Sequence, residues 1–333
     1  MSRGTRDPAE LFEAAGNGDR AATARLLSLI ERGGDPAREV GRLAAPRAGG
    51  AYTVGLTGAP GSGKSTLTSA VIKHLRGQGE EVAVLAIDPS SPFTGGAILG
   101  DRVRMQDHAT DHGVFIRSMA TRGHLGGLSL ATPEAIRLLD ALGHRWILVE
   151  TVGVGQVEVE VAGKADTTVV VVNPGWGDSV QANKAGLMEV ADVFVINKAD
   201  RPGVAETTRD LQQMLELSAE MAHEAVEGDV ADHPAIGWRV PIVPTVGPSG
   251  DGVPELWDRV LAHREYAGTS GLLERRRRYR LGEELREIVA RRLEQRAREL
   301  CTGDRWDALT ERVLGRDVDP WAASDEMLTS VLH

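Results

Sequence analysis

Gly58-Ala-Pro-Gly-Ser-Gly63-Lys64-Ser65 is the stretch of sequence that decides the fold. It matches the pattern G-x-x-x-x-G-K-[ST], follows the apolar run Tyr52–Thr57 and precedes a helical pattern over Thr66–Arg76. A strand, a glycine-rich turn and a helix in this order form a phosphate-binding loop, because backbone N–H groups and the helix N-terminus then point at phosphate oxygens. A chance glycine-rich turn would lack these flanks. The predicted nucleotide contacts here are Gly58, Ala59, Pro60, Gly61, Ser62, Gly63, Lys64, Ser65 and Thr66.

The chain around this loop alternates short apolar runs with helical patterns. Several of the runs are continuously apolar and β-branched, as expected for strands that are buried on both faces of a parallel sheet. We therefore predict an α/β fold with a doubly wound, mostly parallel sheet. The predicted strands are Tyr52–Thr57, Val82–Ile87, Val114–Ile116, Trp146–Val149, Thr168–Val172, Val193–Ile196 and Val240–Val243.

Helical extensions flank this region on both sides. Asp7-Pro8 predicts the start of a helix in an N-terminal extension of residues 1–48, and Gly33–Pro36 predicts a break within it. The nucleotide domain is expected over residues 49–268. Residues 269–333 are expected to form a helical arm with an amphipathic stripe, and the arginine run Arg275–Arg278 is interpreted as a solvated face.

Composition excludes several function classes. The chain has 333 residues with 38 Lys and Arg against 48 Asp and Glu, so its formal net charge is −10 and non-specific nucleic-acid binding is disfavoured. Its single cysteine, Cys301, excludes an intramolecular disulfide and a zinc site built on cysteines. No apolar run approaches the length of about 18 residues that a membrane span needs. We expect a cytoplasmic protein without a nucleic-acid or membrane partner.

A second motif indicates which base the nucleotide carries. Asn197-Lys198-Ala199-Asp200 follows the apolar run Val193–Ile196. A carboxylate at Asp200 can accept both N1–H and N2–H of guanine, whereas adenine would leave it unpaired. Asn197 would brace the loop, and Lys198 would lie along the plane of the base. A backbone N–H for guanine O6 is expected from the later loop Thr245, Val246 and Gly247.

The magnesium and switch residues are expected after two further strands. Lys64 would contact the β- and γ-phosphates and Ser65 would ligate Mg²⁺. The run Trp146–Val149 leads into Glu150, which stands where P-loop proteins usually carry the magnesium-associated Asp. The other candidates are Gly153 as γ-phosphate sensor, Gln156 as a residue that orients the attacking water, and Asp88 and Asp101 near Mg²⁺. A plain Asp-Pro turn at Asp88 and a solvent-facing Gln156 stay open as alternatives.

Five segments together carry a family resemblance: GAPGSGKST, AIDPSSPFTGGAILGDRVRM, ETVGVGQVEVEVA, NPGWGDSVQANKAG and NKADRPG. They resemble the methylmalonyl-CoA mutase-associated GTPases, the MeaB family, historically also called ArgK. In this family Glu replaces the usual Asp after the fourth run, and Glu150 fits that pattern. The guanine-capping loop often contains Ser-Ala in GTPases, and here it contains Thr245-Val246.

The resemblance implies a function that the residues alone do not. It implies a GTP-hydrolysing chaperone, using GTP/GDP and Mg²⁺, that protects a cobalamin-dependent mutase and gates its cofactor loading. It also implies a homodimer formed through the C-terminal helices and a nucleotide-responsive loop over Pro174–Lys184. Within that loop, Trp176 is either tucked into the core or held out as a contact for the mutase. The alternatives are a P-loop kinase, as the older label suggests, a metallochaperone GTPase of the same group, and a scaffold that binds GTP without turnover.

Overall fold

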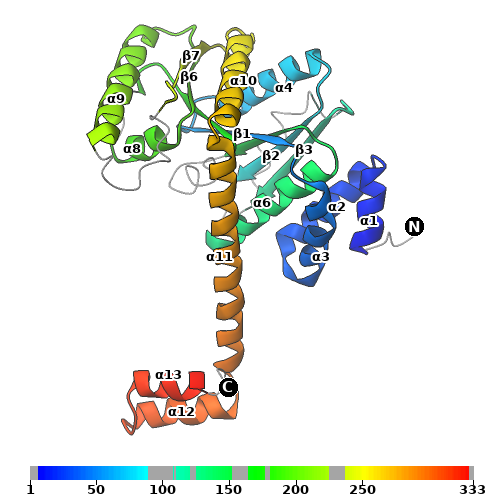
Figure 1. Cartoon of the computed structure of the whole chain (residues 1–333), viewed down its shortest axis with the longest axis vertical. Helices are drawn as coiled ribbons and strands as arrows, with labels where there is room; N and C mark the ends of the chain where they lie inside the picture. Colours follow the sequence, from blue (N-terminus) through cyan, green and yellow to red (C-terminus); the bar gives the residue numbers. More distant parts are fainter. Residues whose placement is uncertain are drawn as a thin grey trace. The chain divides into compact units, whose positions relative to one another are not determined.

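The computed structural model describes residues 7–88, 108, 110–120, 125–151, 164–176, 181–224 and 237–329. Within these residues a seven-stranded parallel sheet has the order β3-β2-β4-β1-β5-β6-β7. The predicted doubly wound parallel sheet is therefore confirmed (Figure 1). The strands are β1 (Tyr52–Gly58), β2 (Val82–Asp88), β3 (Val114–Ala120), β4 (Trp146–Thr151), β5 (Thr167–Val172), β6 (Val193–Asn197) and β7 (Ile242–Thr245).

The last strand lies two residues later than the sequence predicts. Val240–Val243 was expected to be extended, but β7 spans Ile242–Thr245 and pairs with β6 from Phe194 to Asn197. Pro241 has no N–H to donate to a strand ladder, so the ladder begins only after it. Pro241 still accepts through its carbonyl oxygen from the Phe194 N–H at 2.9 Å.

Helices cover both faces of the sheet. α6 (Leu125–Ala141), together with α1 (Pro8–Gly16), α2 (Arg20–Arg32) and α3 (Gly34–Ala44), packs on β2, β3 and β4. On the same face, α8 (Gln181–Val190) and α9 (Val204–Glu224) lie near β5 and β6. α4 (Lys64–Gly77) and α10 (Val253–Thr269) cover the opposite face (Figure 1). The alternation of inward side chains along the strands supplies a core on each face.

The N-terminal extension forms the predicted helices. Asp7 is the N-cap of α1, and its carboxylate accepts from the Ala9 N–H at 2.8 Å, with Pro8 at the first helical position. The predicted break is a single residue, Gly33, whose φ of 71° ends α2 before α3 begins. A short 3₁₀ turn, η1 (Ala45–Arg47), then leads toward β1.

The start of α11 (Leu272–Leu300) corrects one interpretation of the sequence. Arg276 and Arg277 do not lie on a solvated face, because their guanidinium groups reach the buried carboxylates of Asp192 and Asp166. Asp166 and Asp192 directly precede β5 and β6, at the ends of these strands opposite their carboxyl ends. Arg278, in contrast, is exposed and pairs with Glu274.

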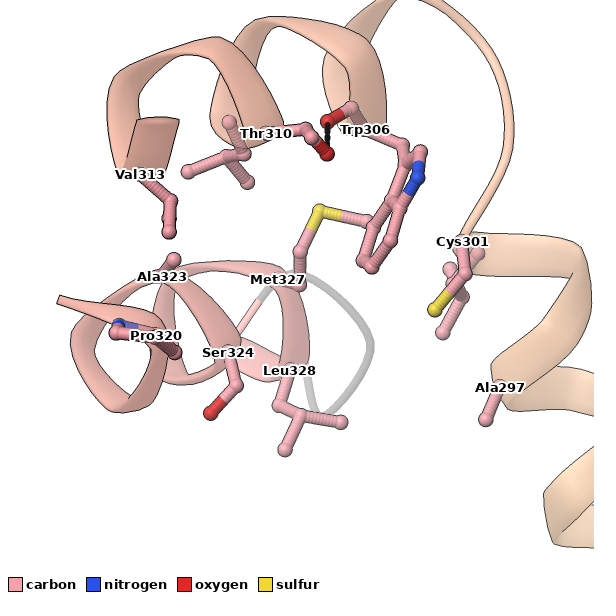
Figure 2. Close-up of a pocket in the computed structure, with 12 residues that line it drawn as sticks. Ala297, Cys301, Trp306, Thr310, Val313, Pro320, Ala323, Ser324, Met327 and Leu328 are labelled. Carbon is pink, nitrogen blue, oxygen red and sulfur yellow. Dashed lines mark hydrogen bonds between the residues drawn. The ribbon is translucent and has the colours of Figure 1, made fainter. Parts of the chain in front are cut away.

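The chain divides into two compact units, residues 1–280 and 281–333. In the second unit, α12 (Asp304–Leu314) and α13 (Pro320–Thr329) pack through Leu309, Ala323 and Met327. Figure 2 shows Trp306, Met327 and Cys301 around a cavity of about 380 Å³ in this unit, lined almost wholly by apolar atoms. The sequence predicts that residues 269–333 are helical but not that they divide into α11, α12 and α13. No helix among the described residues is long and apolar enough to span a membrane.

Candidate active site

The carboxyl ends of β1, β4, β5, β6 and β7 meet at one edge of the sheet and carry the motifs found in the sequence. β1 lies between β4 and β5: the chain places β2, β3 and β4 on one side of β1 and then crosses to place β5, β6 and β7 on the other. Ligands of open α/β sheets bind at such a reversal of strand order, outside the carboxyl ends of the strands. This topology places the glycine-rich loop, Glu150 and the Asn197 loop around one position.

Two glycines shape the loop after β1, and no other residue fits at either position. Gly58 has φ of 134°, and a Cβ there would lie 2.0 Å from the carbonyl oxygen of Val171 on β5. Gly63 has φ of 87°, and a Cβ there would lie 2.6 Å from Asn197 Nδ2. At both positions φ is positive and a backbone or side-chain atom lies too close to leave room for a Cβ. The loop therefore packs tightly against β5 and β6 before α4 begins at Lys64.

Lys64 and Ser65 lie in the first turn of α4, and both are buried. The Lys64 ammonium donates to the carbonyl oxygens of Gly58 at 2.8 Å and Ala59 at 3.2 Å, across the hollow of the loop. The Ser65 hydroxyl donates to Glu150 Oε1 at 2.6 Å. Glu150 is fully buried near the end of β4, opposite Leu56 of β1 and Ala86 of β2. The structure thus brings together one hydroxyl and one carboxylate that the sequence assigned to Mg²⁺.

The fit of this pair to a magnesium ion can be judged from its donor atoms. Mg²⁺ prefers hard oxygen ligands, usually one or two protein groups with water and phosphate oxygens completing the octahedron. Ser65 Oγ and Glu150 supply two such oxygens beside the phosphate loop. The oxygen donors of this pair therefore fit Mg²⁺, which Ser65 would bind directly and Glu150 would bind directly or through water.

Asn197 joins three parts of the site. Its Nδ2 donates to the carbonyl oxygen of Ser62 at 2.8 Å, and its Oδ1 accepts from Thr245 Oγ1 at 3.2 Å and from the Gly247 N–H at 3.1 Å. Asn197 is buried at the end of β6. The predicted bracing role has this geometric basis, because one amide group bridges the phosphate loop and the loop after β7.

Lys198 and Asp200 follow in the same loop. Lys198 adopts a φ of 60°, which is rare outside glycine, and its ammonium donates to the carbonyl oxygen of Gly61 at 2.6 Å. Asp200 is exposed, so its carboxylate is accessible to a base. The Val246 N–H donates to the Asp251 carbonyl and the Gly247 N–H to Asn197. Two of the three residues expected to donate to guanine O6 therefore already use their N–H groups within the chain.

Several predicted residues lie outside the described part of the chain. These are Asp101, Gly153 and Gln156. Asp88 is the last residue of β2, where its backbone is paired with Ala120. Of the loop expected over Pro174–Lys184, Trp176 is buried against β5, β6 and α9, and α8 already begins at Gln181. Of the two positions expected for Trp176, the structure shows the one in which its side chain is buried in the core.

Sequence reasoning missed Asn173. It directly follows β5, as Asn197 ends β6, and its Nδ2 donates to the same Gly61 carbonyl at 3.4 Å. The sequence did contain a signal for Asn173. A polar amide residue at the carboxyl end of a buried β-branched strand faces the site of an open α/β sheet.

Comparison with known proteins identifies the family of this chain. The family model of the methylmalonyl Co-A mutase-associated GTPase MeaB matches residues 23–302. A putative GTPase of Pyrococcus abyssi is 49% identical over 97% of this chain and 96% of its own length. The mouse mitochondrial methylmalonic aciduria type A homolog is 34% identical over 80% of this chain and 65% of its own length.

A solved structure supports the fold. The crystal structure of a LAO/AO transport system kinase superposes with a TM-score of 0.66 and 23% identity, covering 100% of both chains. The glycine-rich loop before α4, the Ser65–Glu150 contact and the Asn197 bridge lie at the carboxyl ends of the strands, the edge at which open α/β sheets bind ligands. With the family model spanning most of the sequence, the chain belongs to the MeaB family of methylmalonyl Co-A mutase-associated GTPases and hydrolyses GTP.

Proposed function

We propose that this GTPase is a chaperone of a cobalamin-dependent acyl-CoA mutase, with methylmalonyl-CoA mutase as the first candidate. Its GTP and GDP states would gate cofactor loading and protect the mutase. The observation that carries the proposal is the match of residues 23–302 to a family described by its association with that mutase. A protein that couples nucleotide to a partner needs two states that the partner distinguishes.

The site residues have distinct roles in the proposed turnover. Lys64 neutralises charge on the β- and γ-phosphates, and the loop N–H groups orient them. Ser65 and Glu150 would hold Mg²⁺, which would stabilise the charge that develops on the phosphate oxygens. Gly153 would sense the γ-phosphate, and Gln156 would orient the water. Asp88 and Asp101 are further candidates near the metal.

Guanine selectivity is assigned to the loop after β6. Asp200 would accept from N1–H and N2–H of the base, and Lys198 would lie along the base plane while its ammonium holds Gly61. Thr245, Val246 and Gly247 would cap O6. Because the Val246 and Gly247 N–H groups already donate within the chain, guanine O6 would share the Gly247 N–H with Asn197 or displace that bond.

We also propose a homodimer formed through the C-terminal helices. The side chains of Leu281, Leu285, Val289 and Leu293 repeat every four residues along α11 and are all about half exposed or more. Ion pairs such as Arg291–Glu287 and Arg298–Glu294 lie on the other side of the same helix. An exposed apolar stripe on one side with charges on the other is typical of a helix that pairs with another helix.

The alternatives receive less support. Metal delivery requires a cluster of ligands, and among the described residues no group of three or more His, Cys, Asp and Glu side chains could hold a metal ion. A kinase would require selection of a second substrate, and the motif at Asn197–Asp200 instead favours guanine.

The proposed function is tested by asking which cobalamin enzyme from the same cell co-purifies with the chain. The complex is then prepared with a non-hydrolysable GTP analogue and, separately, with GDP, and the two preparations are compared. We expect a mutase whose retention and cobalamin loading differ between the two nucleotides. Equal behaviour in both states, in a protein that hydrolyses GTP, would contradict the gating role.

A further inference from the structure

Asn173 and Lys198 converge on one carbonyl oxygen of the phosphate loop. Lys198 Nζ lies 2.6 Å from Gly61 O, and Asn173 Nδ2 lies 3.4 Å from the same oxygen. The two side chains come from the ends of neighbouring strands, β5 and β6. Because both groups bond to one atom, a small movement of the Lys198 side chain would bring its ammonium to the Asn173 amide.

The side-chain oxygen of Asn173, Oδ1, lies in an unusual environment. Asn173 Oδ1 is shielded from solvent and has no hydrogen-bond partner among the described residues. Reversing the amide would place this oxygen against the Gly61 oxygen, so the assigned orientation is the chemically reasonable one. A buried acceptor without a donor costs stability, typically about 1–3 kcal/mol. A feature that costs stability and lies in a site is often retained for function.

The backbone around Asn173 is fixed. The Trp176 N–H donates to the Asn173 carbonyl at 3.2 Å, which closes a tight turn. The Gly175 N–H donates to Thr207 Oγ1 at 2.9 Å, and Trp176 is buried beside β5 and β6. The Asn173 side chain is therefore presented from a rigid turn and not from a loosely attached loop.

We propose that Asn173 is a positioning residue for Lys198. Its Nδ2 shares Gly61 O with the lysine, and its Oδ1 accepts a second N–H from the Lys198 ammonium when nucleotide is bound. The ammonium has three N–H donors, of which Gly61 engages one. Two fixed acceptors define the direction of the lysine stem, which must lie along the plane of the base. The inference rests on the proposed role of Lys198 in guanine binding.

The proposal predicts opposite effects on stability and on nucleotide retention. Asn173→Leu keeps the approximate volume but removes both the weak donor bond and the unpaired acceptor, so the melting temperature is expected not to fall. The same change removes one of the two acceptors proposed to orient the Lys198 ammonium, so GDP is expected to leave about tenfold faster. A residue with a merely structural role would lower stability and retention together.

The experiment measures release of tritiated GDP from the full chain, chased with excess unlabelled GDP. Asn173→Leu is made in the wild-type background and in a Lys198→Ala background. We expect about tenfold faster release in the first and less than twofold in the second, because the effect passes through the lysine. Asn173→Asp retains an acceptor for the ammonium and is expected to release GDP more slowly than Asn173→Leu.

Thr208→Val on α9 is the matched control. It removes a hydroxyl that donates to the Val204 carbonyl within α9 and does not touch the Asn173 turn, Gly61 or Lys198, so release is expected to stay within twofold of wild type. An equal acceleration by Asn173→Leu in both backgrounds, an unchanged rate in the wild-type background, or an equal effect of Thr208→Val would overturn the proposal. A wild-type chain that retains no GDP at all would instead refute the proposed nucleotide function.

Discussion

Arg276 and Asp192 form a bidentate ion pair at the end of the sheet opposite the nucleotide site. Both terminal guanidinium nitrogens donate to the two carboxylate oxygens, each at 3.0 Å. Asp192 is fully buried and also accepts from the Thr168 N–H at 2.8 Å, while His263 Nε2 lies 3.3 Å from its Oδ1. The arginine that appeared to be surface charge in the sequence thus fastens the first turns of α11 to the nucleotide-binding unit.

Arg276→Ala is expected to destabilise the protein by about 3–5 kcal/mol, because it leaves the Asp192 carboxylate buried without its cation. Arg278→Ala is the matched control in the same run of arginines. Its side chain is 82% exposed, against 19% for Arg276, so its loss is expected to cost less than about 1 kcal/mol. Denaturant unfolding of both variants checks this difference, and equal losses would contradict the distinction.

The same pair predicts a pH dependence. Burial raises the pKa of Asp192, but the hydrogen bond with His263 and the charge of Arg276 outweigh it and hold the pKa below its usual value. The unfolded chain then binds this proton more readily, so the stabilisation is present above about pH 4 and is lost as the pH falls through the folded pKa. The stability gap between wild type and Arg276→Ala is expected to narrow from pH 5 to pH 3. Unfolding curves across that range measure it, and a widening gap would contradict the assignment.

The local sequence was sufficient to predict the motifs of the site. It was not sufficient to predict contacts between residues that are far apart in the chain. The glycines of the phosphate loop and Asn197 can be recognised from the few residues around them, since the predicted strand, turn and helix follow one another directly in the sequence. Arg277 and Asp166 are 111 residues apart, so a run of arginines has the same pattern whether it is solvated or inserted. Asn173 was missed for a similar reason: its contact with Gly61 depends on the neighbouring positions of β1 and β5 in the sheet.

Ser65→Ala and Lys64→Ala are expected to impair hydrolysis by different routes. Ser65→Ala removes an oxygen that would bind Mg²⁺, so phosphate release is expected to lose much of its magnesium dependence. Lys64→Ala is expected to lower the turnover about a hundredfold and to keep that dependence, because the metal ligands remain. Phosphate release is measured over a magnesium titration. A Ser65→Ala curve that rises with Mg²⁺ as in wild type would refute the metal assignment.

Asp200→Asn is expected to weaken GTP binding by about 2–3 kcal/mol, because an amide donor would face the N–H groups of guanine. Xanthosine triphosphate should regain affinity, since its base presents an oxygen where guanine has an amino group. Titration calorimetry with GTP, ATP and xanthosine triphosphate compares wild type with the variant. Equal affinity of the wild type for GTP and ATP would exclude guanine selection and favour the kinase alternative.

The leucine stripe of α11 gives the last prediction. Leu285→Glu places a charge in the proposed helix–helix seam and is expected to convert a two-chain species into a one-chain species in light-scattering chromatography. Leu217→Glu on α9 is the matched control, because its side chain is 59% exposed, close to the 62% of Leu285, but lies outside the stripe. Intrinsic GTP hydrolysis should persist in both variants, since neither residue is among those assigned to the nucleotide site. If the wild type is already a single chain at micromolar concentration, or if Leu217→Glu dissociates it equally, the stripe is not the dimer contact.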